Sequence, residues 1–150
     1  MSVSEYMSTR LWQPLGPQSD ASWNLDSDES GFEKLESGLN ATARDYARFG
    51  LLFLHGGRWN GNRVVSEDWV RAATAAQSAT NYESSYGYFW WVDAERPRNF
   101  YALGNYGQYI YVAPGAETVI VRTGSDWGMD NDRWLGVFRD VTDQLADSVR

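Results

Sequence analysis

Three short segments rich in aromatic and β-branched residues constrain the fold of this chain more than any other feature. They cover residues 99–103, 108–112 and 118–122. The turns between them carry Gly104, Gly107, Pro114 and Gly115. Such residues favour strands, and connections this short join neighbouring antiparallel strands. The sequence therefore predicts an antiparallel meander, preceded by one more aromatic strand at residues 86–92.

Helix signals precede this meander. Thr42 followed by Asp45 is a capping-box-like start, and apolar residues follow with helical spacing at Tyr46, Phe49 and Phe53. Gly56-Gly57 ends that helix, and Asn60-Gly61 predicts a small hairpin after it. A second helix is expected to start at the cap Ser66. Its predicted inward face carries Trp69, Val70 and Ala73.

The two ends of the chain also predict helices. Ser4 is expected to cap a short N-terminal helix through Leu11, and a polar, solvated loop is expected over residues 18–36. A strongly amphipathic C-terminal helix is expected to lie across one face of the sheet. Its predicted inward face is formed by Trp134, Val137, Phe138, Val141 and Leu145. The predicted fold class is α+β, an antiparallel meander sheet with flanking and C-terminal helices.

Composition excludes several functions. A net charge of -7 with 13 Lys and Arg spread singly argues against nucleic-acid binding. There is no Cys, and the one His, His55, suits a helix end, so neither a metal site nor a cofactor is expected. The longest apolar run, residues 51–54, is too short for a membrane span. No signal peptide is visible, so the compartment is left open, with a cytoplasmic location expected if the chain is complete as printed.

Four ordered strings give the chain a resemblance to a known family. They are residues 10–16 (RLWQPLG), 42–57 (TARDYARFGLLFLHGG), 86–91 (YGYFWW) and 107–114 (GQYIYVAP). Each is weak alone, but the ordered set resembles serine β-lactamase-like and penicillin-binding-protein-like hydrolases. The similarity is greatest to the branch of carboxylesterases and aminohexanoate-dimer hydrolases. The resemblance implies that residues 1–150 form the C-terminal portion of such a hydrolase domain.

The nucleophile of that family is missing from this sequence. Members use a Ser-x-x-Lys motif and a Tyr that manages the proton, yet the single Lys, Lys34, has Gly31 three positions before it. No Tyr-x-Asn is present either. Ser22-Trp23-Asn24 has the form Ser-x-Asn, but it follows the PLG segment, where the second motif would already have passed. Both motifs are therefore expected before the point where this sequence begins.

The third family element, a strand carrying Lys-Thr-Gly or His-x-Gly, has two registers here. Anchoring on the meander makes the main-chain N–H of Leu103 the oxyanion donor. Matching the form x-x-Gly instead selects Asn105-Tyr106-Gly107, with Asn in place of the cationic residue. We prefer the first register because residues 104–107 form a natural turn. Asn24, Tyr101, Asn105 and Gly107 are the predicted substrate-binding residues, with Asn40 a further residue that could line a cleft.

The leading functional hypothesis is a fragment of a serine hydrolase that cleaves an amide or ester of a small molecule and is inactive alone. The alternative is a non-catalytic partner module that self-associates or is completed by a separate N-terminal half. An aromatic-lined sugar-binding domain is a third hypothesis, which requires exposed Trp side chains. The sequence leaves the acyl group, the leaving group and the oligomeric state undetermined.

Overall fold

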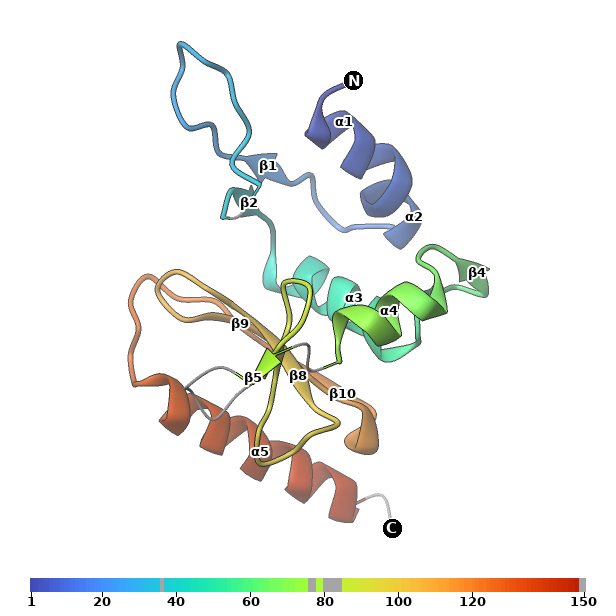
Figure 1. Ribbon diagram of the computed structural model, residues 1–150, viewed down its shortest axis with the longest axis vertical. Helices are drawn as coiled ribbons and strands as arrows, with labels where there is room; N and C mark the ends of the chain where they lie inside the picture. Colours follow the sequence, from blue (N-terminus) through green and yellow to red (C-terminus); the bar gives the residue numbers. More distant parts are fainter. Residues whose placement is uncertain (36, 76–77, 80–84, 149–150) are drawn as a thin grey trace.

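A six-stranded antiparallel sheet forms the centre of the computed structural model, which describes residues 1–35, 37–75, 78–79 and 85–148 (Figure 1). The strand order is β10-β9-β8-β7-β6-β5. The strands are β5 (Ser78–Ala79), β6 (Ser85–Tyr86), β7 (Trp91–Val92), β8 (Phe100–Gly104), β9 (Gln108–Ala113) and β10 (Thr118–Arg122). The predicted α+β class and the meander β8-β9-β10 are confirmed, with boundaries shifted by one residue at most.

The predicted strand over residues 86–92 is wrong as a single element. The segment splits into β6 and β7, which pair with each other around a turn closed by the Gly87 N–H donating to the Trp90 carbonyl at 2.7 Å. Phe89 in this turn has a φ of 65°, a left-handed conformation outside the strand region. At Gly87 a Cβ would lie 2.2 Å from the carbonyl oxygen of Ala73, so only glycine fits. Both constraints come from tertiary packing.

Helix α3 (Ala43–Leu54) covers one face of the sheet (Figure 1). Thr42 caps it by accepting from the Asp45 N–H, as predicted. Phe53 is buried and Tyr46 and Phe49 pack beside it, which confirms the predicted face. Gly50 lets the helix approach closely, because a Cβ there would lie 2.6 Å from Val119. This helix and the sheet form the first core.

Helix α5 (Asn131–Ser148) packs on the opposite face of the sheet (Figure 1). Leu135 and Phe138 contact the tyrosines of β8 and β9 and form the second core. Trp134 and Phe138 of the predicted face do pack here, but Val137, Val141 and Leu145 are 40–44% exposed, so that part of the prediction is wrong. The helix is rotated so that its buried stripe runs through Leu135, Phe138 and Thr142.

The second predicted helix and the hairpin before it are also present. Strands β3 (Arg58–Trp59) and β4 (Asn62–Arg63) pair around the Asn60-Gly61 turn, and Ser66 caps helix α4 (Glu67–Ala73). Val70 and Ala73 are buried as predicted. Trp69 is not, because its ring is 47% exposed and stacks on Tyr88 instead.

The N-terminal third lies on the far side of α3 from the sheet (Figure 1). It contains α1 (Val3–Met7), the π-helical turn η1 (Ser8–Trp12), α2 (Gln13–Leu15), and the paired strands β1 (Ser22–Trp23) and β2 (Leu39–Asn40). The cap is Ser2, with Glu5 completing a capping box, so the predicted cap Ser4 is wrong. The expected solvated loop is a β1–β2 excursion that includes a bridge between Leu25 and Glu33.

Within the described parts of the chain, no helix has the length and apolarity needed to cross a membrane.

Candidate functional site

Among the residues that the structure describes, no strand pairs with the outer edge of β8 near Leu103. Strand β7 pairs with β8 only at Phe100 and Tyr101, whereas β9 pairs with β8 along its whole length. The Asn99 carbonyl accepts from the Asp93 N–H at 2.9 Å, so the backbone groups of residue 99 point toward the β7 side. Backbone groups alternate along a strand, so those of Leu103 point to the same side. No strand of the described residues covers β8 at that position.

The turn between β8 and β9 is held from the side by Arg122. Its guanidinium donates to the carbonyls of Tyr106, at 3.1 Å, and Gly107, and through its other nitrogen to the Asp126 carbonyl at 3.0 Å. Gln108 adds two more bonds, accepting from the Gly124 N–H at 3.0 Å and donating to the Gly124 carbonyl at 2.5 Å. The turn is therefore fixed to the loop that follows β10.

Exposed aromatic rings border this turn. Tyr106 is 57% exposed and Trp127 is 51% exposed, and their ring centroids are 6.4 Å apart. Tyr106 has a φ of 61°, which is strained for a residue with a side chain. The Arg122 guanidinium lies 4.3 Å from the centroid of Trp134. Sequence reasoning missed Arg122 and Trp127, whose roles depend on contacts between separate segments.

The predicted substrate-binding residues fall in different environments. Asn105 and Gly107 lie in the β8–β9 turn; Gly107 has a φ of 70°, and a Cβ there would lie 2.7 Å from Arg122, so the turn itself requires glycine. Tyr101 is only 1% exposed and packs in the second core. Its backbone pairs with Trp91 of β7 and Tyr111 of β9, so the structure leaves neither the ring nor the backbone of Tyr101 open to a substrate.

Asn24 and Asn40 come together on the β1–β2 pair. The Asn40 side-chain amide donates to Asn24 Oδ1 at 2.9 Å and to the Gly38 carbonyl at 3.1 Å. No hydrogen bond between described residues joins Asn24 to the β8–β9 turn. The predicted site residues thus form two groups, one on the β8–β9 turn and one on the β1–β2 pair.

Two hollows adjoin the β1–β2 pair. The larger, of about 520 Å³, lies between the N-terminal helical segment and this pair, with Met7, Trp12, Trp23 and Leu39 among its walls. The smaller, of about 380 Å³, is lined by residues that include Ser22, Asn40 and Thr42. No hydroxyl in these walls has a lysine or histidine hydrogen-bonded to it in the described structure, so neither hollow contains an activated nucleophile.

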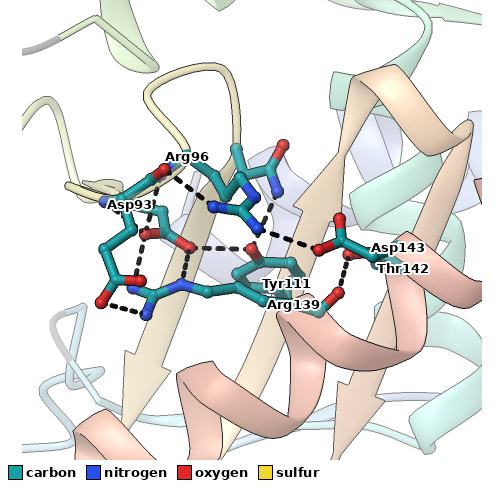
Figure 2. Close-up of polar contacts among 8 residues, drawn as sticks. Asp93, Arg96, Tyr111, Arg139, Thr142 and Asp143 are labelled. Atoms are coloured by element: carbon teal, nitrogen blue, oxygen red, sulfur yellow. Dashed lines mark hydrogen bonds and ion pairs between the residues drawn. The ribbon is translucent and has the colours of Figure 1, made fainter.

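A buried polar cluster connects the sheet to α5 (Figure 2). Asp93 is fully buried and accepts two bonds from the Arg139 guanidinium, at 2.6 and 2.9 Å, and one from the Tyr111 hydroxyl at 2.8 Å. Asn99 donates to that hydroxyl at 2.8 Å, and Glu95 pairs with Arg139 at 2.6 Å. Every charge in the cluster has a partner, as a buried ion pair requires.

The pKa values of this cluster describe a structural site. Burial opposes ionisation of Asp93, but the bonds from Arg139 and Tyr111 hold the pKa of Asp93 below its usual range. Burial raises the pKa of Tyr111, and it raises the pKa of Tyr109 to about 12. Both phenols therefore stay protonated at neutral pH, which does not suit a general base.

Among the described residues, no three His, Asp or Glu side chains gather as a metal ion would require. Two Trp side chains, Trp69 and Trp127, are among the large exposed apolar residues, and they lie on different elements. They make no common aromatic platform through the ring contacts of the described residues. The sugar-binding hypothesis therefore gains no support from the geometry.

Comparison with known proteins places this α+β arrangement in the class of β-lactamase-like hydrolases. The family model Beta-lactamase matches residues 1–135, so the chain belongs to the β-lactamase family. The 6-aminohexanoate-dimer hydrolase of Paenarthrobacter ureafaciens is 34% identical over 143 residues, which cover 89% of this chain and 36% of the relative.

A solved structure gives the same result. A putative 6-aminohexanoate-dimer hydrolase from Bacillus anthracis superposes with a TM-score of 0.85 at 31% identity, covering 98% of this chain and 39% of that one. The family inferred from the ordered strings is thereby confirmed. This chain spans little more than a third of the length of both relatives.

Proposed function

We propose that this chain is the C-terminal portion of a serine hydrolase that cleaves amide or ester bonds of small molecules through an acyl-serine intermediate. One observation carries the proposal: similarity to 6-aminohexanoate-dimer hydrolases extends over nearly the whole chain, while the sequence contains no Ser-x-x-Lys motif. The chain then supplies the sheet and one wall of the active site, and the nucleophile belongs to residues outside it. Alone, the chain is inactive.

In the proposed reaction, the serine oxygen attacks the carbonyl carbon of the substrate and the carbonyl oxygen becomes an oxyanion. The C–N or C–O bond then breaks, the leaving amine or alcohol takes up a proton, and water releases the acid from the serine. The main-chain N–H of Leu103 donates to the oxyanion. A donor aimed where charge develops accelerates turnover by about two to three orders of magnitude. The open edge of β8 at this position supports the assignment.

Substrate contacts are assigned to two groups of residues, which we place on the two sides of a cleft in the complete enzyme. Asn105 and Gly107 present the β8–β9 turn, whose position Arg122 fixes. Asn24, bonded to Asn40, contributes from the β1–β2 pair. Tyr101 holds this strand between β7 and β9 rather than contacting the substrate, because the whole residue is buried and paired on both sides.

The first test is an assay of the purified chain with a 4-nitrophenyl ester and a chromogenic β-lactam. We expect no burst of product and no turnover above the uncatalysed rate, because no activated serine is present. A burst that is abolished by a serine-directed acylating reagent would contradict the proposed inactivity.

The variant Asn105→Ala, made in a complete enzyme, distinguishes between the two registers of the third motif. The enzyme is a chimera in which this chain replaces the matched segment of the Paenarthrobacter ureafaciens hydrolase, assayed on 6-aminohexanoate dimer. If Leu103 is the oxyanion donor, the turnover rate changes less than about threefold. If the turnover rate instead falls by about tenfold or more, as expected when a hydrogen bond to a charged substrate group is lost, Asn105 stands in place of the cationic residue and the second register is supported.

A non-catalytic partner module is the second candidate. It is favoured by the apolar side chains that the N-terminal third exposes, including Tyr6, Phe32 and Leu35. Self-association of the purified chain without any gain of hydrolase activity in the chimera would support this candidate over the first.

A further inference from the structure

The N-terminal third of the molecule contains an open hollow between the α1–η1 segment and the β1–β2 pair. Helix α1 has no buried residue, and its Met7 lines one wall of this hollow together with Trp12 of η1. Across the hollow of about 520 Å³ stand Trp23 and Leu39 of the β1–β2 pair. Apolar walls that face each other across an opening leave much of their area in contact with water, which is unfavourable.

Hydrogen bonds fix the positions of the two walls relative to each other. At one end, the Glu33 carboxylate accepts from the N–H groups of Val3, at 2.8 Å, and Ser4, at 3.2 Å, and so joins the β1–β2 excursion to the start of α1. The side-chain bond from Ser4 is the main reason that the pKa of Glu33 lies below its usual range. At pH 7 the carboxylate that bridges the two walls is therefore ionised.

At the other end, buried Asp45 of α3 fixes the segment that leaves α2. Its carboxylate accepts from the N–H groups of Gln18, at 2.7 Å, and Ser19, at 3.3 Å, and also binds Thr42 and Arg48. Leu15 is 2% exposed and anchors the same segment. These bonds fix both ends of the segments that border the hollow.

The comparisons indicate what fills it. The Bacillus anthracis structure superposes on 98% of this chain, so the N-terminal third is part of the shared fold, yet the greater part of that relative lies outside the match. We take the unmatched part to belong to the same domain, in which it packs against the matched part and covers apolar surface. The N-terminal third carries both a preformed hollow and exposed apolar side chains.

We propose that the hollow between α1–η1 and β1–β2 is the docking surface for that remaining part of a β-lactamase-family domain, whether in the same polypeptide or in a separate one. The occupant presents apolar side chains to Met7, Trp12, Trp23 and Leu39 and neutral or basic groups to the acidic residues Glu5 and Asp20, which also line the hollow. The inference rests on the proposed function for the identity of the occupant.

The first experiment measures the opening in the chain as it stands, with the dye 8-anilinonaphthalene-1-sulfonate as probe. We expect Met7→Asp and Leu39→Asp, at two residues that line the hollow, each to reduce dye fluorescence at least twofold. The matched control is Phe89→Asp, at a residue that is 74% exposed and outside the hollow. This variant should keep the dye fluorescence within about 20% of that of the unchanged chain. Equal losses in all three variants, or none in the first two, would overturn the proposal.

The second experiment tests the occupant by hydrogen exchange, comparing the chain with the chimera described above. We expect the amides of residues 3–12 and 22–40 to exchange at least tenfold more slowly in the chimera, while those of β9 are protected in both. Unchanged exchange in 3–12 would overturn the docking surface. Protection without hydrolysis of 6-aminohexanoate dimer would keep the surface and reject the proposed function.

If the chimera does not fold, the unmatched segment of the Paenarthrobacter ureafaciens hydrolase is added as a separate polypeptide, and its co-elution with this chain is measured by size-exclusion chromatography. Binding that Met7→Asp weakens at least tenfold, with Phe89→Asp unchanged, supports the proposal. Equal binding by both variants, or a dimer of this chain that buries the hollow without the segment, would overturn it.

Discussion

Asp93 and Arg139 show how much a single buried pair determines in this protein. Arg139 is 12% exposed and Asp93 is fully buried, and the guanidinium meets the carboxylate through two hydrogen bonds (Figure 2). The residues are 46 positions apart in the sequence. Nothing in the sequence predicts this pairing, because an Asp in a turn and an Arg on an amphipathic helix are each common at a surface. The pair fixes α5 against the loop between β7 and β8.

Arg139→Met is expected to destabilise the protein by about 3–5 kcal/mol, because it leaves the Asp93 carboxylate buried without its cation. Urea denaturation at pH 7 measures the change in the free energy of unfolding. The control is Arg96→Met, which removes the ion pair between Arg96, 45% exposed, and Asp143, 57% exposed. It should lower the free energy of unfolding by less than about 1 kcal/mol. A similar loss in both variants would show that burial of the pair does not set its contribution.

At the scale of elements, the sequence predicted the features that depend on residues close together in the chain. The cap of α3 at Thr42, the Asn60-Gly61 hairpin and the three strands of the meander each depend on residues close together in the sequence, and all were predicted. The inward face of α5 was not, because Arg139 must point toward Asp93 and this rotates the buried stripe by about one residue.

The two glycines inside helices provide a test of helix packing. Gly50→Ala in α3 should destabilise the protein by about 1–3 kcal/mol, because the new Cβ would lie 2.6 Å from Val119 and 2.9 Å from Ile110. Gly136→Ala in α5 meets nothing within 4 Å and should stabilise by about 0.5–1 kcal/mol through helix propensity. The measurement is the midpoint of thermal unfolding for both variants, and a stabilising Gly50→Ala would contradict the close approach of α3 to the sheet.

At the scale of the whole molecule, two buried carboxylates make stability depend on pH. Burial opposes ionisation of Asp45, but the Gln18 N–H, the Thr42 hydroxyl and the Arg48 guanidinium hold the pKa of Asp45 below its usual range, and the pKa of Asp93 is lowered likewise. The unfolded chain, in which an Asp pKa is about 3.9, binds protons first as the pH falls. Acid therefore favours unfolding.

The free energy of unfolding should be nearly constant from pH 7 to about pH 5 and should fall as the pH drops through about 4 toward the lower folded-state values. Urea titrations at pH 7, 5, 4 and 3 measure it. In Asp45→Asn the fall between pH 5 and pH 3 should be smaller, because one of the two linked carboxylates is absent. A stability that rises on acidification over this range would contradict the lowered pKa values.

The sequence predicted the family and the meander β8-β9-β10 of the sheet, but only part of the candidate site. Leu103, Asn105 and Gly107 were named from a motif, and the choice between its two registers stays a prediction. Arg122 and Trp127, which border the turn, were missed, because their contacts join segments about 15 to 20 residues apart through backbone carbonyls and ring packing. Substrate binding by any of these residues stays a prediction.

The π-helical turn η1 sets the orientation of the N-terminal helix. A π turn holds about one residue more than an α turn, and one residue corresponds to about 100° of rotation around a helix. The single extra residue between Met7 and Trp12 therefore decides which side of α1 faces the β1–β2 pair. The number of residues in this turn, rather than the pattern of apolar and polar side chains, therefore sets which side of α1 faces the rest of the molecule.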